Sequence, residues 1–118
     1  MADYKRIEVR EVAGIAVVQF RDAKYTDELR ILELGQELLD LVENGGYRKI
    51  VLNFGRIEFF SSGALGKLIT LDKRIRALTG TLVCCNIQPD IFEVFKITRL
   101  DRLFKIYPSE DAALNAVK

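Results

Sequence analysis

Two short segments near the start of the chain have the pattern of β-strands. Residues 7–12 alternate apolar and charged side chains over most of their length, which is the period of a strand with one face in water. Gly14 then gives a short turn, and the apolar segment 15–20 follows as a more buried partner. The pattern predicts an antiparallel pair of strands at one edge of a sheet.

The period then changes to that of amphipathic helices. Asp27 can cap a helix whose apolar side chains fall on one broad stripe, until an Asn-Gly-Gly sequence ends it. A second helix is expected over residues 62–79, with Gly80 as its C-cap. A third begins at Pro89, because proline is tolerated at the first position of a helix, and a fourth follows Ser109 as its cap.

Apolar segments between these helices predict further strands. The element order becomes β-β-α-β-α-β-α-β-α, which is typical of an α/β fold with a mixed, mainly parallel sheet of about five strands and about four helices. We expect residues 1–118 to form a single domain. Sites in open α/β sheets collect where strand C-termini meet helix N-termini. The segments with strand character are residues 49–54, 81–87 and 104–107.

The composition excludes several classes of function. The 118 residues contain no His and only two Cys, which removes His-based catalysis and both His-ligated and all-thiolate zinc sites. Because 18 Lys and Arg nearly balance 17 Asp and Glu, the chain lacks the basic field of a nonspecific nucleic-acid binder. No apolar run approaches the roughly 20 residues of a membrane helix. We therefore expect a cytoplasmic protein that is not an enzyme and has no cofactor, no metal, no nucleic-acid partner and no membrane partner.

The adjacent residues Cys84 and Cys85 lie in one of the expected strands. Successive side chains of a strand point to opposite faces, so a disulfide between these neighbours would be strained. We expect two buried, inert thiols.

A Ser-Ser-Gly turn joins the expected central strand to the second helix. It combines the hydroxyl groups of Ser61 and Ser62 with the free N–H groups and positive dipole end of a helix start. Either serine can be the N-cap of the helix. Alternatively, a serine here is a phosphoacceptor, or the N–H groups around Gly63 hold an anion.

Over nearly its whole length, from the first hairpin to residue 116, the chain resembles the STAS domain, specifically the bacterial anti-sigma factor antagonists. The resemblance implies a small α/β domain that binds an anti-sigma factor, usually a serine/threonine kinase. Binding frees the sigma factor, and phosphorylation of the antagonist reverses it. The stretches that carry the resemblance are residues 49–54, 59–69, 83–89, 94–95 and 103–106.

The loop of this family normally reads Asp-Ser-Ser/Thr-Gly-Leu-Gly, with the second hydroxyl residue as phosphoacceptor. Aligned without a gap through the following Leu-Gly, the acceptor position falls on Gly63 and the Asp position on Ser61. A shift by one residue places the acceptor on Ser62 and makes Ala64 an insertion. Both alignments lack the Asp. Ser62 is the first acceptor candidate and Ser61 the second, and the alternative is a phosphoswitch that is altered or lost.

Three surfaces near this turn are candidates for partner contact. Lys67, with other polar residues off the apolar stripe of the second helix, either solvates that helix or forms a basic strip for an acidic partner. Phe59 and Phe60 cannot both point inward in an extended segment, so one is expected to face out as an aromatic anchor. The segment 21–27 resembles the segment through which the family contacts its partner. The alternative is that it is only a polar connection with a helix cap. The complete set of partner-binding candidates is Lys24, Tyr25, Thr26, Phe59, Phe60, Ser61, Ser62, Gly63 and Lys67.

These observations favour a protein-interaction domain that binds an anti-sigma factor or a related serine/threonine kinase. One alternative is a small module that holds an anion or nucleotide at the start of the second helix. Another is a STAS scaffold subunit that associates with copies of itself or with related proteins and has no phosphoswitch.

Overall fold

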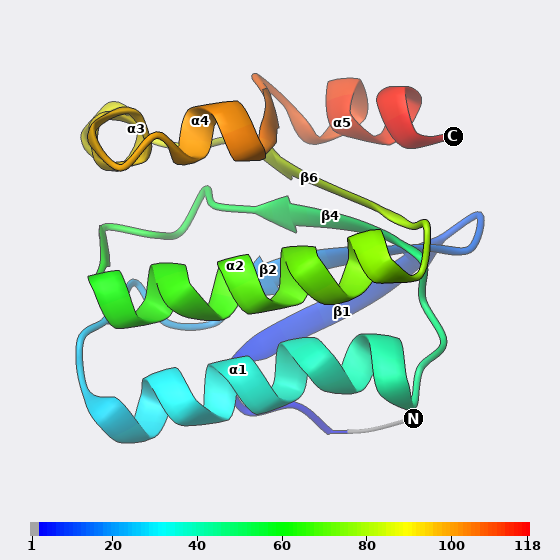
Figure 1. Ribbon diagram of the computed structural model, residues 1–118, viewed down its shortest axis with the longest axis horizontal. Helices are drawn as coiled ribbons and strands as arrows, with labels where there is room; N and C mark the ends of the chain where they lie inside the picture. The colour runs from blue at the N-terminus through cyan, green and yellow to red at the C-terminus, as the bar shows by residue number, and fades with distance from the viewer. Residues whose placement is uncertain (1–2) are drawn as a thin grey trace.

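A five-stranded sheet forms the centre of the protein, which a computed structural model describes over residues 3–118 (Figure 1). Its strand order is β1-β2-β4-β6-β7. The first two strands form an antiparallel hairpin, and every other neighbouring pair is parallel. The mixed, mainly parallel sheet predicted from the sequence is therefore confirmed. Its strands are β1 (Ile7–Val12), β2 (Ile15–Phe20), β4 (Lys49–Asn53), β6 (Thr81–Cys85) and β7 (Lys105–Tyr107).

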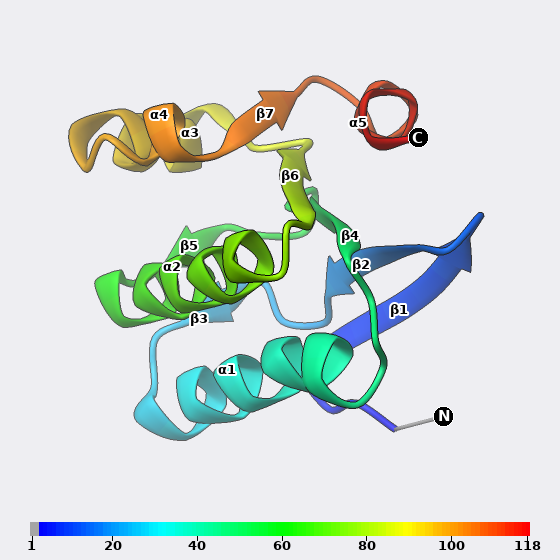
Figure 2. The same cartoon turned by 45° about the vertical axis from the view of Figure 1, so that its right-hand side comes forward.

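The helices cover the two faces of this sheet unequally. Figure 2 shows α1, α2 and α3 on one side of the strands and α5 on the other. Residues 3–118 contain one more helix than expected, because the short α4 interrupts the connection between α3 and β7. The helices are α1 (Glu28–Glu43), α2 (Ser62–Ala77), α3 (Pro89–Ile97), α4 (Leu100–Leu103) and α5 (Glu110–Val117).

Two very short strands form a second, separate sheet that the sequence pattern did not predict. These are β3 (Lys24–Tyr25) and β5 (Phe59–Phe60), which pair in parallel. Neither strand is long enough to show a period of two, so both segments had the pattern of loops.

The ends of the long helices follow from their capping residues. Asp27 and Ser109 are the N-caps of α1 and α5, as predicted, and each accepts a hydrogen bond from the third residue after it. The prediction that Gly80 is the C-cap of α2 is wrong. The helix ends at Ala77 with Leu78 as its C-cap, and Thr79 takes the left-handed conformation with φ of 58°. Gly80 is required for another reason, since a Cβ there would lie 2.4 Å from the carbonyl oxygen of Arg48.

The two faces of the sheet bury separate apolar cores. The larger core lies under α1, α2 and α3, and the smaller one lies under α5. Cys84 belongs to the larger core and Cys85 to the smaller, so the predicted alternation of the two thiols is confirmed. Both thiols are buried and free, and burial raises the pKa of Cys84 strongly and that of Cys85 to about 12. They are therefore protonated and unreactive near neutral pH.

Candidate partner-binding site

The small β3–β5 sheet joins two segments that the sequence had singled out separately. Lys24 lies opposite Phe59, and Tyr25 lies opposite Phe60. The carbonyl oxygen of Tyr25 also accepts a hydrogen bond of 3.2 Å from the backbone N–H of Ser61. The connection before α1 is thus fixed to the turn before α2, and Figure 2 shows both helix N-termini at the same end of the molecule.

An aromatic cluster packs beneath this sheet. Phe60 packs against Phe20, Tyr25 and Phe54, with ring centroids 5.6 Å apart in each pair. The Tyr25 hydroxyl donates a 2.7 Å hydrogen bond to the carbonyl oxygen of Arg6, and burial raises the pKa of this phenol. The sequence placed Tyr25 and Phe60 among the partner-binding candidates. Their side chains lie in the core, where they support the surface from beneath.

Phe59 is the aromatic residue of the pair that faces out. Its side chain is 50% exposed, whereas that of Phe60 is 4% exposed, so the predicted alternation is confirmed. Two further exposed apolar residues, Leu29 and Leu32, lie in the first half of α1 at 64% and 49% exposure. We call Leu29, Leu32 and Phe59 the apolar surface. Sequence reasoning missed the two leucines, although both are apolar residues that lie off the buried stripe of their helix.

The two serines of the turn have different environments. Ser61 is the N-cap of α2, and its Oγ accepts a 3.2 Å hydrogen bond from the N–H of Ala64. Ser62 is the first residue of the helix and is exposed, and its hydroxyl has no hydrogen-bond partner within residues 3–118. The first turn of α2 contains no acidic residue. An added negative charge at Ser62 would therefore meet the positive end of the helix dipole without repulsion from that turn.

Gly63 has space for a side chain. A Cβ at this position would lie 3.6 Å from the nearest atom of Ile31 and 3.8 Å from Ser61 Oγ, which are ordinary van der Waals contacts. The absence of a hydroxyl residue at this position is thus not imposed by packing.

Arg74 and Arg76, two basic residues off the apolar stripe of α2, are engaged in different directions, which favours a solvated helix face over a basic strip. Arg74 pairs with Glu43 on α1. Arg76 pairs with the buried Asp72 at 2.7 Å and also donates to the carbonyl oxygen of Leu103. The stem of Lys67 lies across Gly35, where a Cβ would come within 2.6 Å of Lys67 Cδ.

Of the polar candidates on the other segment, Lys24 and Thr26 are both exposed. Lys24 lies in β3 and Thr26 follows that strand, while Ser62, Gly63 and Lys67 lie in the first two turns of α2. Figure 2 shows the N-terminal ends of α1 and α2 at the same end of the molecule.

Two hollows of the described surface lie away from the start of α2. One of about 620 Å³ lies beside β7, and one of about 1000 Å³ lies between β1 and α1. Neither is lined by Ser62, Gly63 or Ala64. Ser62 and Gly63 are exposed at this helix start, which suits contact with a protein better than enclosure of a small ligand. Within residues 3–118, no helix has the length and apolar character needed to cross a membrane.

Comparisons with known proteins agree with this architecture. The family model described as "STAS domain" matches residues 6–113. A Bordetella bronchiseptica protein named "Putative anti-sigma factor antagonist BtrV" is 35% identical over 86 residues, which cover 73% of each chain. The crystal structure of a Thermotoga maritima protein described as a "putative anti-sigma factor antagonist" superposes with a TM-score of 0.82 at 25% identity, over 94% of this chain and 93% of that one.

A more distant structure shares the fold alone. The Bacillus cell fate determinant SpoIIAA, in its phosphorylated form, superposes with a TM-score of 0.73 at 18% identity, over 95% of this chain and 99% of that one.

Proposed function

Because the chain belongs to the STAS domain family, we propose that it acts in the cytoplasm as an anti-sigma factor antagonist that binds a kinase-type anti-sigma factor. The resemblance recognised in the sequence is confirmed, and antagonists of this family are regulatory proteins and not enzymes. The observation that carries the proposal is the pairing of β3 with β5, which brings the two candidate segments together beside the start of α2.

The proposed contact surface has an apolar centre and a polar rim. Leu29, Leu32 and Phe59 supply exposed apolar area, and protein interfaces commonly derive most of their affinity from a few such anchors. Lys24 and Lys67 add local positive charge at the rim, which suits an acidic partner surface and accelerates association. The aromatic cluster under Phe59 keeps this surface fixed before binding, so little ordering entropy is lost.

Regulation by phosphorylation is proposed to act on Ser62. Ser61 Oγ is held in the helix cap, whereas the Ser62 hydroxyl is exposed without a partner in the described residues. The capping role of Ser61 also supports the alignment without a gap, because Asp and Ser are both good N-caps. In that alignment the usual acceptor position is Gly63, so Ser62 is an offset acceptor. A phosphate on Ser62 would add up to two negative charges beside the apolar surface and weaken binding.

Calorimetric titration with a purified kinase-type anti-sigma factor from the source organism tests the binding surface. Phe59→Ala should weaken the affinity by about tenfold or more, since it removes an aromatic anchor. Ile97→Ala is the matched control, because Ile97 is an exposed apolar residue at the far end of α3. Equal affinity of both variants and the native protein would contradict the proposed surface.

Incubation with the same kinase and ATP, followed by peptide mass spectrometry, tests the acceptor. We expect phosphate on Ser62, its loss in Ser62→Ala and its retention in Ser61→Ala. Gly63→Ser restores a hydroxyl at the usual acceptor position, where the packing leaves room, and should be modified faster. A kinase that modifies Gly63→Ser but leaves the native chain unmodified would show that the phosphoswitch has been lost, while the binding proposal would stand.

A further inference from the structure

A second candidate site lies between β1 and the C-terminal half of α1. It is a hollow of about 1000 Å³. Because α1 has 16 residues, its two ends are about 24 Å apart, so the hollow is well separated from the apolar surface. Its lining combines aromatic, aliphatic and acidic side chains. The lining residues used below are Tyr4, Val9, Glu11, Asp40, Leu41 and Tyr47.

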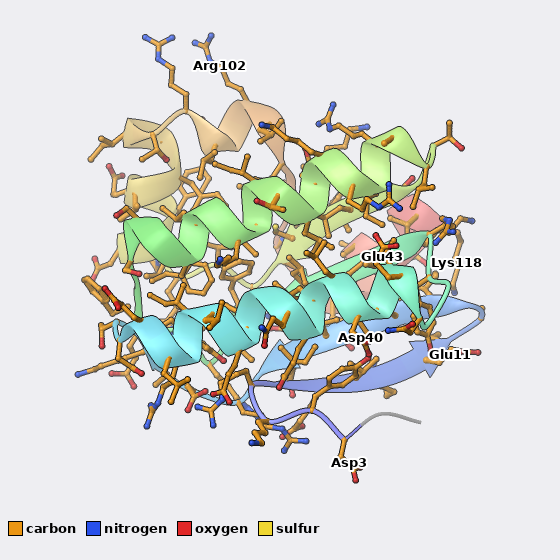
Figure 3. The ribbon with its side chains drawn as sticks, turned by 60° about the horizontal axis from the view of Figure 1, so that its bottom comes forward. Asp3, Glu11, Asp40, Glu43, Arg102 and Lys118 are labelled. Carbon is orange, nitrogen blue, oxygen red and sulfur yellow. The ribbon has the colours of Figure 1, made fainter. Side chains whose placement is uncertain are left out.

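Two tyrosines in the hollow each donate a hydrogen bond to a carboxylate. Tyr4 donates to Asp40 Oδ2 at 2.8 Å, and Tyr47 donates to Glu11 Oε1 at 2.7 Å. Burial and the neighbouring carboxylate raise the pKa of Tyr4, and the bond to Glu11 raises the pKa of Tyr47, so both phenols stay neutral donors. Hydrogen bonds from Asn44 and Tyr4 lower the pKa of Asp40 and keep it ionised. Figure 3 shows Asp40 on α1 and Glu11 on β1 at the same side of the molecule.

The formal charges that line this hollow balance, but its ion pairs do not run across it, and the carboxylates on the lining are Asp3, Glu11 and Asp40. Three basic residues also line the hollow, but each forms an ion pair with a carboxylate outside it. Neither Asp40 nor Glu11 forms an ion pair within residues 3–118. The carboxylates of Asp40 and Glu11 therefore line the hollow without an ion-pair partner within residues 3–118. The outward ion pairs are Lys5 with Glu33 at 3.9 Å, Arg6 with Asp22 at 3.1 Å, and Arg21 with Glu8 at 3.5 Å.

We propose that this hollow binds an alkylammonium group, with Asp40 and Glu11 as charge partners and the rings of Tyr4 and Tyr47 around the cation. Aromatic rings attract cations through their negative faces, and a carboxylate that accepts a bond from the phenol adds to this attraction. Val9 and Leu41 provide apolar contact for the alkyl chain. The cation is either a free amine or a lysine side chain of another protein. The proposal does not depend on the proposed function, because the two sites share no residue.

Titration of the full-length protein with n-butylammonium chloride, followed by nuclear magnetic resonance of the tyrosine rings, tests this site. Saturable shifts of the Tyr4 and Tyr47 signals are expected, with Tyr107 unchanged because it lies in β7 and packs against the smaller core. Pentan-1-ol is the uncharged control of similar length, and sodium chloride at the same concentration controls for ionic strength. An acetylated Gly-Gly-Lys-Gly-Gly peptide forms the second arm, and tighter binding of either probe identifies the source of the cation.

Variants that remove a carboxylate charge from the hollow separate binding at this site from binding of the amine elsewhere on the protein. Glu11→Gln and Asp40→Asn should each weaken n-butylammonium binding by about fivefold or more, as expected for loss of a charge partner. Glu11 is exposed, so its variant will fold even if Asp40→Asn does not. Asp101→Asn, on the distant α4, is the matched control and should bind like the native protein. Equal binding of pentan-1-ol, unchanged binding in Glu11→Gln, or no shift at Tyr4 and Tyr47 with either amine would overturn the proposal.

Discussion

The two adjacent phenylalanines of β5 provide the sharpest test of how the site is built. Phe60 is 4% exposed and contacts three aromatic rings, whereas Phe59 is 50% exposed. Replacing a buried Phe by Ala typically costs about 3–5 kcal/mol, which includes the lost ring contacts and the cavity. For Phe59, half of a burial worth about 1.5–3 kcal/mol gives a cost of about 1 kcal/mol.

The expected difference between the two variants is therefore about 2–4 kcal/mol in the free energy of unfolding. Domains of this size are stable by about 5–15 kcal/mol, so Phe60→Ala should still fold at low temperature. Urea unfolding followed by circular dichroism measures both variants against the native protein. At a temperature where both variants are folded, Phe59→Ala should lose more affinity for the anti-sigma factor than Phe60→Ala, since it removes the anchor. Equal destabilisation by the two substitutions would refute the assignment of one ring to the core and one to the surface.

Three further predictions concern the turn, the glycines and the thiols. Ser61→Ala should lower the free energy of unfolding by about 1 kcal/mol through loss of the cap, whereas Ser62→Ala should change it by less than about 0.5 kcal/mol in the same urea assay. Gly80→Ala should destabilise the protein, because its Cβ would lie 2.4 Å from a backbone oxygen. Gly66→Ala should stabilise the protein by up to about 1 kcal/mol, because it adds helix propensity in open space. A thermal unfolding experiment that ranks the two variants in the opposite order would contradict this prediction. Cys84 and Cys85 should react with a thiol reagent only as fast as the protein unfolds, and rapid labelling of the native state would be inconsistent with their burial.

The elements that could be predicted from the sequence are those whose signals are local. The β1–β2 hairpin follows from alternation around a glycine turn, and the caps Asp27 and Ser109 follow from residue type. The β3–β5 sheet could not be predicted, because two-residue strands have no period and their pairing joins segments more than thirty positions apart in the sequence. Thr79 adopts the left-handed conformation expected of Gly80, because tertiary packing against Arg48 decides where the glycine is needed.

The candidate site was predictable residue by residue but not as an arrangement. The alternation of Phe59 and Phe60 was predicted from strand geometry, and the choice of Ser61 over Ser62 as the cap required the structure. Leu29 and Leu32 were not predicted, because single apolar residues off the buried stripe of a helix are common on protein surfaces. Their importance is visible only once α1 and β5 are seen to share one end of the molecule (Figure 2).

Release of sigma factor from a preformed complex with its anti-sigma factor tests the central claim most directly. The labelled sigma factor is followed by fluorescence anisotropy while this protein is added. The account predicts a dose-dependent fall in anisotropy with the native protein, a fall that requires about tenfold more of Phe59→Ala, and a native response with Ile97→Ala. An anisotropy that stays constant at a saturating concentration of native protein, with the cognate anti-sigma factor shown to be active, would contradict the claim that this chain is an anti-sigma factor antagonist.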